Sequence, residues 1–319
     1  MTITSTGSHH TSDLPIVNGS AYHLGIDANA LAPAIIIVGD PERVDRIADE
    51  HLETIEVRVS HRGLTTCTGT ARETKQRVTV TTSGMGAPSI EIVLNEIIAL
   101  AELDPKTNGR RSYVAPMTII RVGTCGALQP RTALGTSIIS SHAVGLDSTA
   151  WFYAAGMAQD ETSQNLAHVV KRAIEERLSA DDSARGKIHP YGARGDGEVS
   201  EALRKAADEL GVRYEIGTTV TASGFFAPQG RDVGRIPASV IDLDRAIAAD
   251  DRFLNMDMET AFLLHFCGGC GVRAGALCVA VANRALDTFE IDFARHMSDA
   301  VGVALRALAT TWSSEPEVP

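Results

Sequence analysis

Residues 119–128 have the sequence Ile119-Ile120-Arg121-Val122-Gly123-Thr124-Cys125-Gly126-Ala127-Leu128, which joins the features of a buried strand to those of a ligand-binding loop. The first residues are apolar and β-branched, as in strands buried on both faces. An arginine inside such a strand is costly to bury unless an anion neutralises it. The two glycines permit a tight turn and a close approach of backbone N–H groups to a ligand. Arg121 and Thr124 are therefore candidate ligand-binding residues, and a carboxylate at a sheet edge is the alternative partner for Arg121.

The composition favours a packed intracellular protein. Of the 319 residues, 44% are hydrophobic, enough for a sizeable core, and the five cysteines do not suggest a secretory disulfide framework. No apolar run reaches the roughly 18 residues of a membrane span, and the N-terminus does not resemble a signal peptide. The net charge of −11 argues against a nucleic-acid or membrane partner, so a phosphate site would need a local concentration of arginine. We expect a cytoplasmic location.

Apolar strands alternate with helical patterns along the chain. Strands are expected at 34–38, 77–82, from 119, at 136–140, 218–222 and 274–282, and helices at 42–48, 90–100, 260–267 and 291–308. This alternation predicts an α/β fold, specifically a single three-layer α/β/α domain with a mixed, mainly parallel central sheet.

The domain is expected to cover residues 21–310. Residues 1–20 are polar and are expected to form a flexible N-terminal tail, and residues 311–319 a C-terminal tail. Two polar stretches, at about 104–116 and 179–196, are interpreted as insertions in surface loops.

Several arginines occupy positions that suit a phosphate. Gly39 ends a strand, and Asp40-Pro41 begins a helix whose N-terminus favours an anion. Arg43 in the first turn opposes the helix dipole unless an anion lies nearby. Arg62 follows in a short polar segment. Each guanidinium alone could belong to a surface ion pair, but together with Arg121 they favour a phosphate site.

Two later segments carry candidate residues for a sugar and a base. Asp257 and Glu259 flank Met258 where a helix is expected to start, and carboxylates can accept hydrogen bonds from sugar hydroxyls. Alternatively, the two carboxylates only stabilise the N-terminus of the helix through its dipole. Residues two apart do not share a helix face, so we expect only one of them to bind a ligand fully. Gln229 and Arg231 follow two phenylalanines and could hold an imide edge, unless the segment is simply a turn anchored by aromatic burial.

Other motifs argue against cofactor and metal chemistry. The glycines of Ser83-Gly84-Met85-Gly86 follow a strand, but the third glycine and the later acidic residue of a dinucleotide-binding turn are missing. Cys267-Gly268-Gly269-Cys270 has the spacing of a metal-ligand pair without a second pair. No metal site is expected.

Together, the motifs resemble the nucleoside phosphorylase-I family. The matching segments, in order from about residue 21 to 308, are Tyr22-His23-Leu24-Gly25, Val38-Gly39-Asp40-Pro41-Glu42-Arg43, Ser60-His61-Arg62, Gly84-Met85-Gly86-Ala87-Pro88-Ser89 and Arg121-Val122-Gly123-Thr124-Cys125-Gly126. Within the family, Phe225-Phe226-Ala227-Pro228-Gln229-Gly230-Arg231 and Asn283-Arg284 resemble the uridine phosphorylases.

The resemblance implies a pentosyltransferase that converts uridine and phosphate to uracil and ribose 1-phosphate, with deoxyuridine and thymidine as further candidate substrates. It implies no metal or organic cofactor, since inorganic phosphate is a co-substrate. It also implies a homo-oligomer, at least a dimer, with shared active sites. The residue roles carried over are phosphate binding by Gly39, Arg43, Arg121, Thr124 and a neighbouring subunit's Arg62; ribose binding by Asp257, Met258, Glu259 and a neighbouring subunit's His23; and base binding by Phe225, Gln229 and Arg231. Arg121, Gln229 and Arg231 are the expected catalytic residues.

The sequence departs from the uridine phosphorylase pattern at one position and leaves other activities open. Asp257 stands where these enzymes typically carry glutamate, which puts its sugar contact in doubt. Purine enzymes of the family have a Ser-Asp element where this chain has Asn283-Arg284, so pyrimidine preference is expected. A purine or broad-specificity phosphorylase, a nucleoside hydrolase and a non-catalytic nucleoside-binding protein are the alternatives.

Overall fold

The computed structural model describes residues 13–104, 109, 111–153 and 160–313. These residues form two compact units, 13–84 with 91–117 in the first and 85–90 with 118–313 in the second. Helix α2, Ala87–Glu102, begins in the second unit and continues in the first. Most of the predicted N-terminal tail, parts of the 104–116 stretch and residues 314–319 lie outside the described residues. Within the described part of the chain, no helix is long and apolar enough to cross a membrane.

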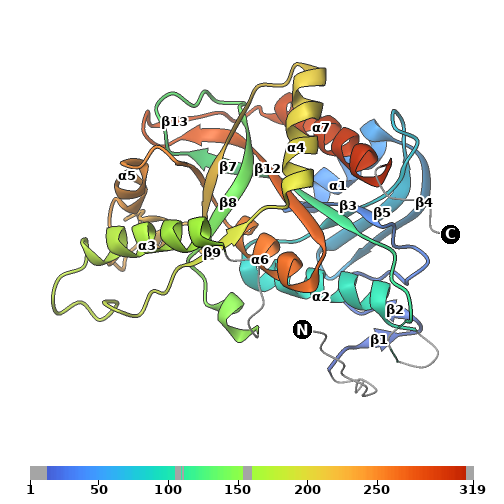
Figure 1. Ribbon diagram of the computed structural model, residues 1–319, viewed down its shortest axis with the longest axis horizontal. Coiled ribbons are helices and arrows are strands. Elements are labelled where there is room, and N and C mark those ends of the chain that lie inside the picture. Colours follow the sequence, from blue (N-terminus) through green and yellow to red (C-terminus); the bar gives the residue numbers. More distant parts are fainter. Residues whose placement is uncertain (1–12, 105–108, 110, 154–159, 314–319) are drawn as a thin grey trace. The chain divides into compact units, whose positions relative to one another are not determined.

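The first unit contains a four-stranded sheet and helix α1, Pro41–His51 (Figure 1). The strand order is β3 (Ala34–Val38), β6 (Arg77–Thr82), β5 (Leu64–Ala71) and β4 (Leu52–His61). The β3–β6 pair is parallel and the other two pairs are antiparallel. Two short strands, β1 (Ile16–Val17) and β2 (Ser20–Ala21), pair within the segment that had been predicted to be a tail.

Helix α1 begins where the sequence predicted. The carboxylate of Asp40 accepts a hydrogen bond from the Glu42 amide at 3.0 Å, and Pro41 occupies the first helical position. The β4–β5 hairpin was not predicted. Its turn uses Arg62 and Gly63 with φ angles of 51° and 79°, the left-handed conformation that a tight two-residue hairpin turn requires.

The second unit is built around five strands whose hydrogen bonding closes into a ring. Its strands are β7 (Thr118–Ala127), β8 (Ser137–Gly145), β10 (Tyr214–Thr221), β11 (Phe253–Asp257) and β12 (Arg273–Asn283). The pairs β7–β12, β8–β10 and β10–β11 are parallel, whereas β8–β12 and β7–β11 are antiparallel. This arrangement places β7 between β11 and β12, a feature that determines the neighbours of Arg121.

Two further strands and several helices complete the second unit. They are β9 (Tyr191–Arg194), β13 (Thr288–Phe289), α3 (Glu161–Glu175), α4 (Gly197–Leu210), α5 (Leu243–Ala248), α6 (Thr260–Cys270) and α7 (Ala294–Ser313), with 3-10 turns at Thr149–Phe152 and Ala227–Gln229. Helices α4 and α7 pack on each other and on β12, while α3 and α6 pack against β8 and β9. Small buried side chains such as Cys125, Ala280 and Cys278 form a core cluster with Ile138 and Leu254. The mixed α/β class predicted from the sequence is confirmed.

The structure differs from the sequence-based expectations in three places in this unit. β7 continues through Ala127, so Gly123 to Gly126 belong to the strand rather than to a loop. Residues 191–194 of the expected insertion form the largely buried strand β9. Residues Phe253–Asp257 form strand β11, which was not predicted, whereas α6 begins at Thr260 as predicted.

Candidate active site

The side chain of Arg121 lies in the interior of the second unit, between two carboxylates. Arg121 is 3% exposed; its Nη1 lies 3.0 Å from Asp257 Oδ2, and its Nη2 donates to Glu259 Oε2. The Nε–H of Arg121 has no acceptor among the residues that the structure describes. Burial favours the neutral form, but Cys278, Glu259 and Asp257 outweigh it and raise the pKa of the guanidinium above its ordinary value. The carboxylate-partner alternative for Arg121 is therefore present, and its buried Nε–H remains without a partner among the described residues.

Glu259 lies immediately before helix α6, and its carboxylate has two donors. Its Oε1 accepts from the amide of Gly86 at 2.5 Å, and its Oε2 accepts from Arg121. Burial raises the pKa of Glu259; Arg121 opposes that shift and the charge of Asp257 adds to it. One guanidinium balances two buried carboxylates, so this cluster carries an excess negative charge when both acids are ionised.

Thr124 and Met258 lie next to these groups in the sequence and are both partly exposed. Thr124 is three residues beyond Arg121 on β7 and pairs in register with Val279 of β12. Met258 stands between the two carboxylates, after the end of β11. Both predicted residues thus belong to segments that carry the Arg121 cluster.

The predicted base-binding segment is an irregular loop in which an arginine packs on an aromatic ring. The guanidinium carbon of Arg231 lies 3.8 Å from the centroid of Phe225, and Phe225 contacts Phe226 edge to face. Burial and the charge of Arg284 lower the pKa of Arg231. Phe225 is half exposed, so one apolar ring and one guanidinium are displayed together.

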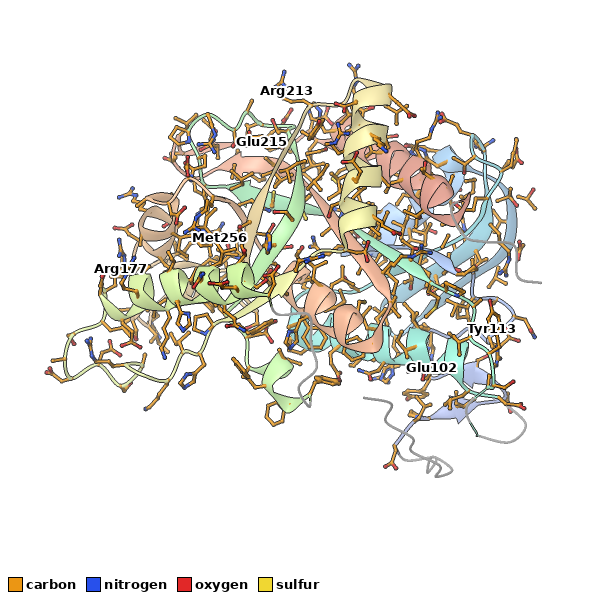
Figure 2. All side chains as sticks on the ribbon, viewed as in Figure 1. Glu102, Tyr113, Arg177, Arg213, Glu215 and Met256 are labelled. Carbon is orange, nitrogen blue, oxygen red and sulfur yellow. The ribbon has the colours of Figure 1, made fainter. Side chains whose placement is uncertain are left out.

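The backbone carbonyl of Gln229 accepts a hydrogen bond from Arg284, a contact that the sequence did not reveal. Arg284 Nη2 donates to the Gln229 carbonyl oxygen at 2.9 Å, and Arg284 Nε lies 2.9 Å from Asp244 Oδ2. Arg284 also approaches the sulfur of Met256, a buried residue labelled in Figure 2. Gln229 itself is 3% exposed. The Asn283-Arg284 motif is recognisable in the sequence, but nothing there indicates its contact with Gln229.

The remaining predicted phosphate residues belong to the first unit. Gly39 lies between β3 and α1, and Arg43 is in the first turn of α1. Arg62 occupies the β4–β5 turn, where its Nη1 donates to the hydroxyl of Tyr22 at 3.2 Å and its guanidinium stacks on the same ring. The structure thus gives Arg62 a defined position on its own unit.

His23, the predicted ribose contact of a neighbouring subunit, is anchored by a buried acid. Its Nδ1 lies 2.6 Å from Glu96 Oε1, and the Glu96 carboxylate also accepts from the amides of His23 and Leu24. Glu96 is 3% exposed and was missed in the sequence, where it is one of three glutamates in the otherwise apolar helix α2. The side chain of His23 remains partly exposed, at 26%.

Comparison with known proteins assigns the chain to a family. The uridine phosphorylase of Thermococcus kodakarensis is 30% identical over 305 residues, covering 94% of this chain and 90% of that protein. The uridine phosphorylase of Escherichia coli is 28% identical over 272 residues (82% and 86% covered), and a DeoD-type purine nucleoside phosphorylase of Roseobacter denitrificans is 29% identical over 252 residues (75% and 98%).

A solved structure is similar over nearly the whole chain. The nucleoside phosphorylase of Trypanosoma brucei, described as showing uridine phosphorylase activity, superposes with a TM-score of 0.84 at 29% identity, covering 93% of this chain and all of that one. The family described as the Phosphorylase superfamily matches residues 33–310. With its buried arginine, its paired carboxylates and these matches, the chain belongs to the phosphorylase superfamily.

Proposed function

We propose that the chain is a uridine phosphorylase, a pentosyltransferase that transfers ribose from uridine to inorganic phosphate. The observation that carries this proposal is the Arg121 cluster, in which a buried guanidinium lies beside a carboxylate with spare acceptor capacity. An anion suits the guanidinium and a sugar hydroxyl suits Glu259. Family membership, with several uridine phosphorylases among the relatives, supports the same reaction.

The proposed reaction needs no covalent intermediate on the protein. A phosphate oxygen attacks the anomeric carbon of the ribose while the glycosidic bond to uracil breaks. Uracil leaves with its bonding electron pair as an anion and then takes a proton. The protein stabilises this charge as it develops and holds phosphate close to the anomeric carbon. No metal or organic cofactor is part of this proposal.

The base loop provides groups of the required kind. Arg231, stacked on Phe225, is a cation that can donate to a carbonyl oxygen of the leaving uracil. Gln229 offers an amide that can both donate and accept at the imide edge. Phosphate is assigned to Arg121, Thr124, Gly39 and Arg43, and ribose to Met258 and Glu259, by resemblance to the family.

The oligomeric and cellular parts of the proposal rest on resemblance and composition. Arg62 and His23 would serve the active site of a neighbouring copy, so the functional protein would be at least a dimer. Each is held in a defined position on its own unit, Arg62 by Tyr22 and His23 by Glu96. An odd number of cysteines without a secretory disulfide framework suits a reducing cytosol and supports a cytoplasmic location.

A purine nucleoside phosphorylase is the second candidate because one relative has that name. A purine enzyme would need an acid to protonate the departing base. Asn283 occupies the corresponding motif and uses its side chain within the protein, donating to the Gln129 and Thr132 carbonyl oxygens at 2.9 and 2.7 Å. Asp287 is exposed in the following turn. These contacts favour a pyrimidine substrate.

The test is release of free base from uridine and inosine, each with and without phosphate, followed by ultraviolet absorbance. We expect phosphate-dependent release of uracil and little hypoxanthine. Equal or faster turnover of inosine would replace this proposal with the purine alternative. Release without phosphate would indicate a hydrolase, and no release from either nucleoside would leave a binding protein.

A further inference from the structure

Asp257 and Glu259 both contact Arg121, but they differ in how many donors they already have. Asp257 Oδ1 accepts from Thr221 Oγ1 at 2.6 Å. Asp257 Oδ2 accepts from the hydroxyl and the amide of Thr260, at 2.5 and 3.3 Å, and lies 3.0 Å from Arg121 Nη1. An ionised carboxylate has about four acceptor sites, so Asp257 has little capacity left. Its side chain is also completely buried, whereas that of Glu259 is 5% exposed.

Cys278 connects Arg121 to Asp257 from the neighbouring strand. Arg121 Nη1 donates to Cys278 Sγ at 2.7 Å, and the thiol lies 3.8 Å from Asp257 Oδ2. Burial raises the pKa of Cys278 to about 11, against the opposing effect of Arg121, so the thiol is protonated at neutral pH. A protonated thiol can accept from the arginine and donate to the aspartate at the same time.

Glu259 is the partner of Arg121 that phosphate could replace. It has two donors, the Gly86 amide and Arg121, and so keeps acceptor capacity that Asp257 lacks. A ribose hydroxyl that hydrogen-bonds to Glu259 would free Nη2 of Arg121 for the phosphate dianion.

We propose that Asp257 and Cys278 form a clamp that orients Arg121 for phosphate, and that Asp257 does not contact the ribose. Asp257 is then a positioning residue, and Glu259 alone provides the ribose carboxylate. The proposal rests on the uridine phosphorylase function and assigns the shorter acid at position 257 a role in that site. It predicts that altering the clamp raises the KM for phosphate and not the KM for the nucleoside.

The central experiment is the steady-state kinetics of Asp257→Asn, with phosphate varied at saturating uridine and uridine varied at saturating phosphate. We expect the KM for phosphate to rise at least about tenfold and the KM for uridine to change by less than about twofold, since a misplaced guanidinium costs binding only where it acts. A rise confined to the uridine KM would show a ribose contact. A fall in the phosphate KM would show that the aspartate only repels the anion. Either result would overturn the clamp.

Asp147→Asn is the matched control because Asp147 is another buried carboxylate of the second unit. Asp147 is 5% exposed and accepts from the hydroxyl of Tyr191 at 2.6 Å, which is not part of the Arg121 cluster. It should lower thermal stability and leave both KM values within about twofold of wild type. If this control also raised the phosphate KM tenfold, the effect of Asp257→Asn would be general destabilisation and the proposal would fail.

The thiol is tested by Cys278→Ala, Cys278→Ser and the control Cys267→Ala. Serine can still accept from Arg121 and donate to Asp257, whereas alanine cannot. We expect alanine to raise the phosphate KM about three- to tenfold and serine to raise it less, while Cys267→Ala, a buried cysteine of α6, leaves it unchanged. An unchanged phosphate KM in Cys278→Ala would remove the thiol from the clamp.

A double variant keeps the test valid if Asp257→Asn does not fold. Asp257→Glu adds a methylene to a closed space and should be damaging alone, whereas Asp257→Glu with Cys278→Ala makes room for it. A rise in the phosphate KM of the double variant that is smaller than the product of the two single-variant rises supports the clamp, and a rise equal to that product contradicts it. Phosphate binding measured by calorimetry needs no turnover. Failure of wild-type uracil release would therefore refute the function, while unchanged phosphate affinity in the variants would refute only the clamp.

Discussion

The guanidinium of Arg121 folds back over Gly123, two residues further along β7, so closely that a methyl group on Gly123 would lie 2.2 Å from Nη1. Residues two apart on a strand point to the same face, so the missing side chain at Gly123 creates the space that Arg121 occupies. Glycine is required here for space and not for backbone conformation, since its φ is not in the left-handed region.

Replacing Gly123 with alanine should therefore displace Arg121 from Asp257 and Glu259. We expect kcat/KM for phosphorolysis to fall about 100-fold, the loss that follows a small misplacement of a positioning group. Gly197→Ala is the matched control, because a methyl group there meets nothing within 4 Å. Steady-state kinetics of both variants checks this, and wild-type kinetics in Gly123→Ala would show that Arg121 tolerates another position.

Glu259→Gln should make the protein more stable and less active. The raised pKa of buried Glu259 means that its ionisation opposes folding, so the stability it contributes is complete at low pH and is lost as the pH rises through its folded value. The difference in unfolding free energy between variant and wild type should grow as the pH increases from 4 to 7. Denaturant unfolding at several pH values measures it, and a constant or shrinking difference contradicts the assignment.

Arg284→Ala should weaken nucleoside binding through Gln229. Without Arg284, the Gln229 carbonyl loses its 2.9 Å partner and buried Asp244 loses its cation. We expect the uridine KM to rise about tenfold while the phosphate KM stays within about twofold. Arg252→Ala removes an exposed ion pair to Asp250 and serves as the control. A selective rise in the phosphate KM of Arg284→Ala would place Arg284 elsewhere in the mechanism.

His265 should make the protein sensitive to acid. Burial lowers the pKa of His265 to about 4, and the charge of Asp147 only partly opposes this. In the unfolded chain the imidazole takes a proton below about pH 6.5, so stability is lost as the pH falls from 6.5 towards 4, by up to about 3 kcal/mol.

His265→Leu removes the imidazole that is protonated on unfolding. The stability of this variant should therefore fall less than that of wild type between pH 7 and pH 5. Thermal unfolding at both pH values measures the difference. His189→Gln changes an exposed imidazole and should retain the wild-type dependence. An equal acid dependence in His265→Leu and wild type would show that other groups cause it.

Local signals explain which elements the sequence predicted. The strand Ala34–Val38 and the Asp40-Pro41 helix start need only their own residues to be identified, and both are present in the structure. The β4–β5 hairpin escaped prediction because Arg62 takes a left-handed φ that is rare for arginine. Strand β9 was not predicted because its burial depends on contacts with α3, which is distant in sequence. The two elements pack so closely that a methyl group placed on Gly192 would lie 2.1 Å from the Ser163 carbonyl oxygen.

The residues of the candidate site could be predicted from the sequence, but their contacts with one another could not. Arg121, Asp257 and Glu259 were each identified from local sequence. Their mutual contacts join residues more than 130 positions apart, and they depend on β7 lying between β11 and β12. Cys278 gave no signal at all, since a single cysteine in an alanine-rich strand is an ordinary core residue.

Asn283 connects two loops, with consequences for amide hydrogen exchange. Its side chain donates to the carbonyls of Gln129 and Thr132 and accepts from the amides of Ala285 and Leu286 at 3.0 and 3.1 Å. Amide protons in exposed loops usually exchange with solvent quickly, because little must open to release them. Here the amide protons of Ala285 and Leu286 are held by a fully buried side chain, so their exchange should require the two loops to separate together.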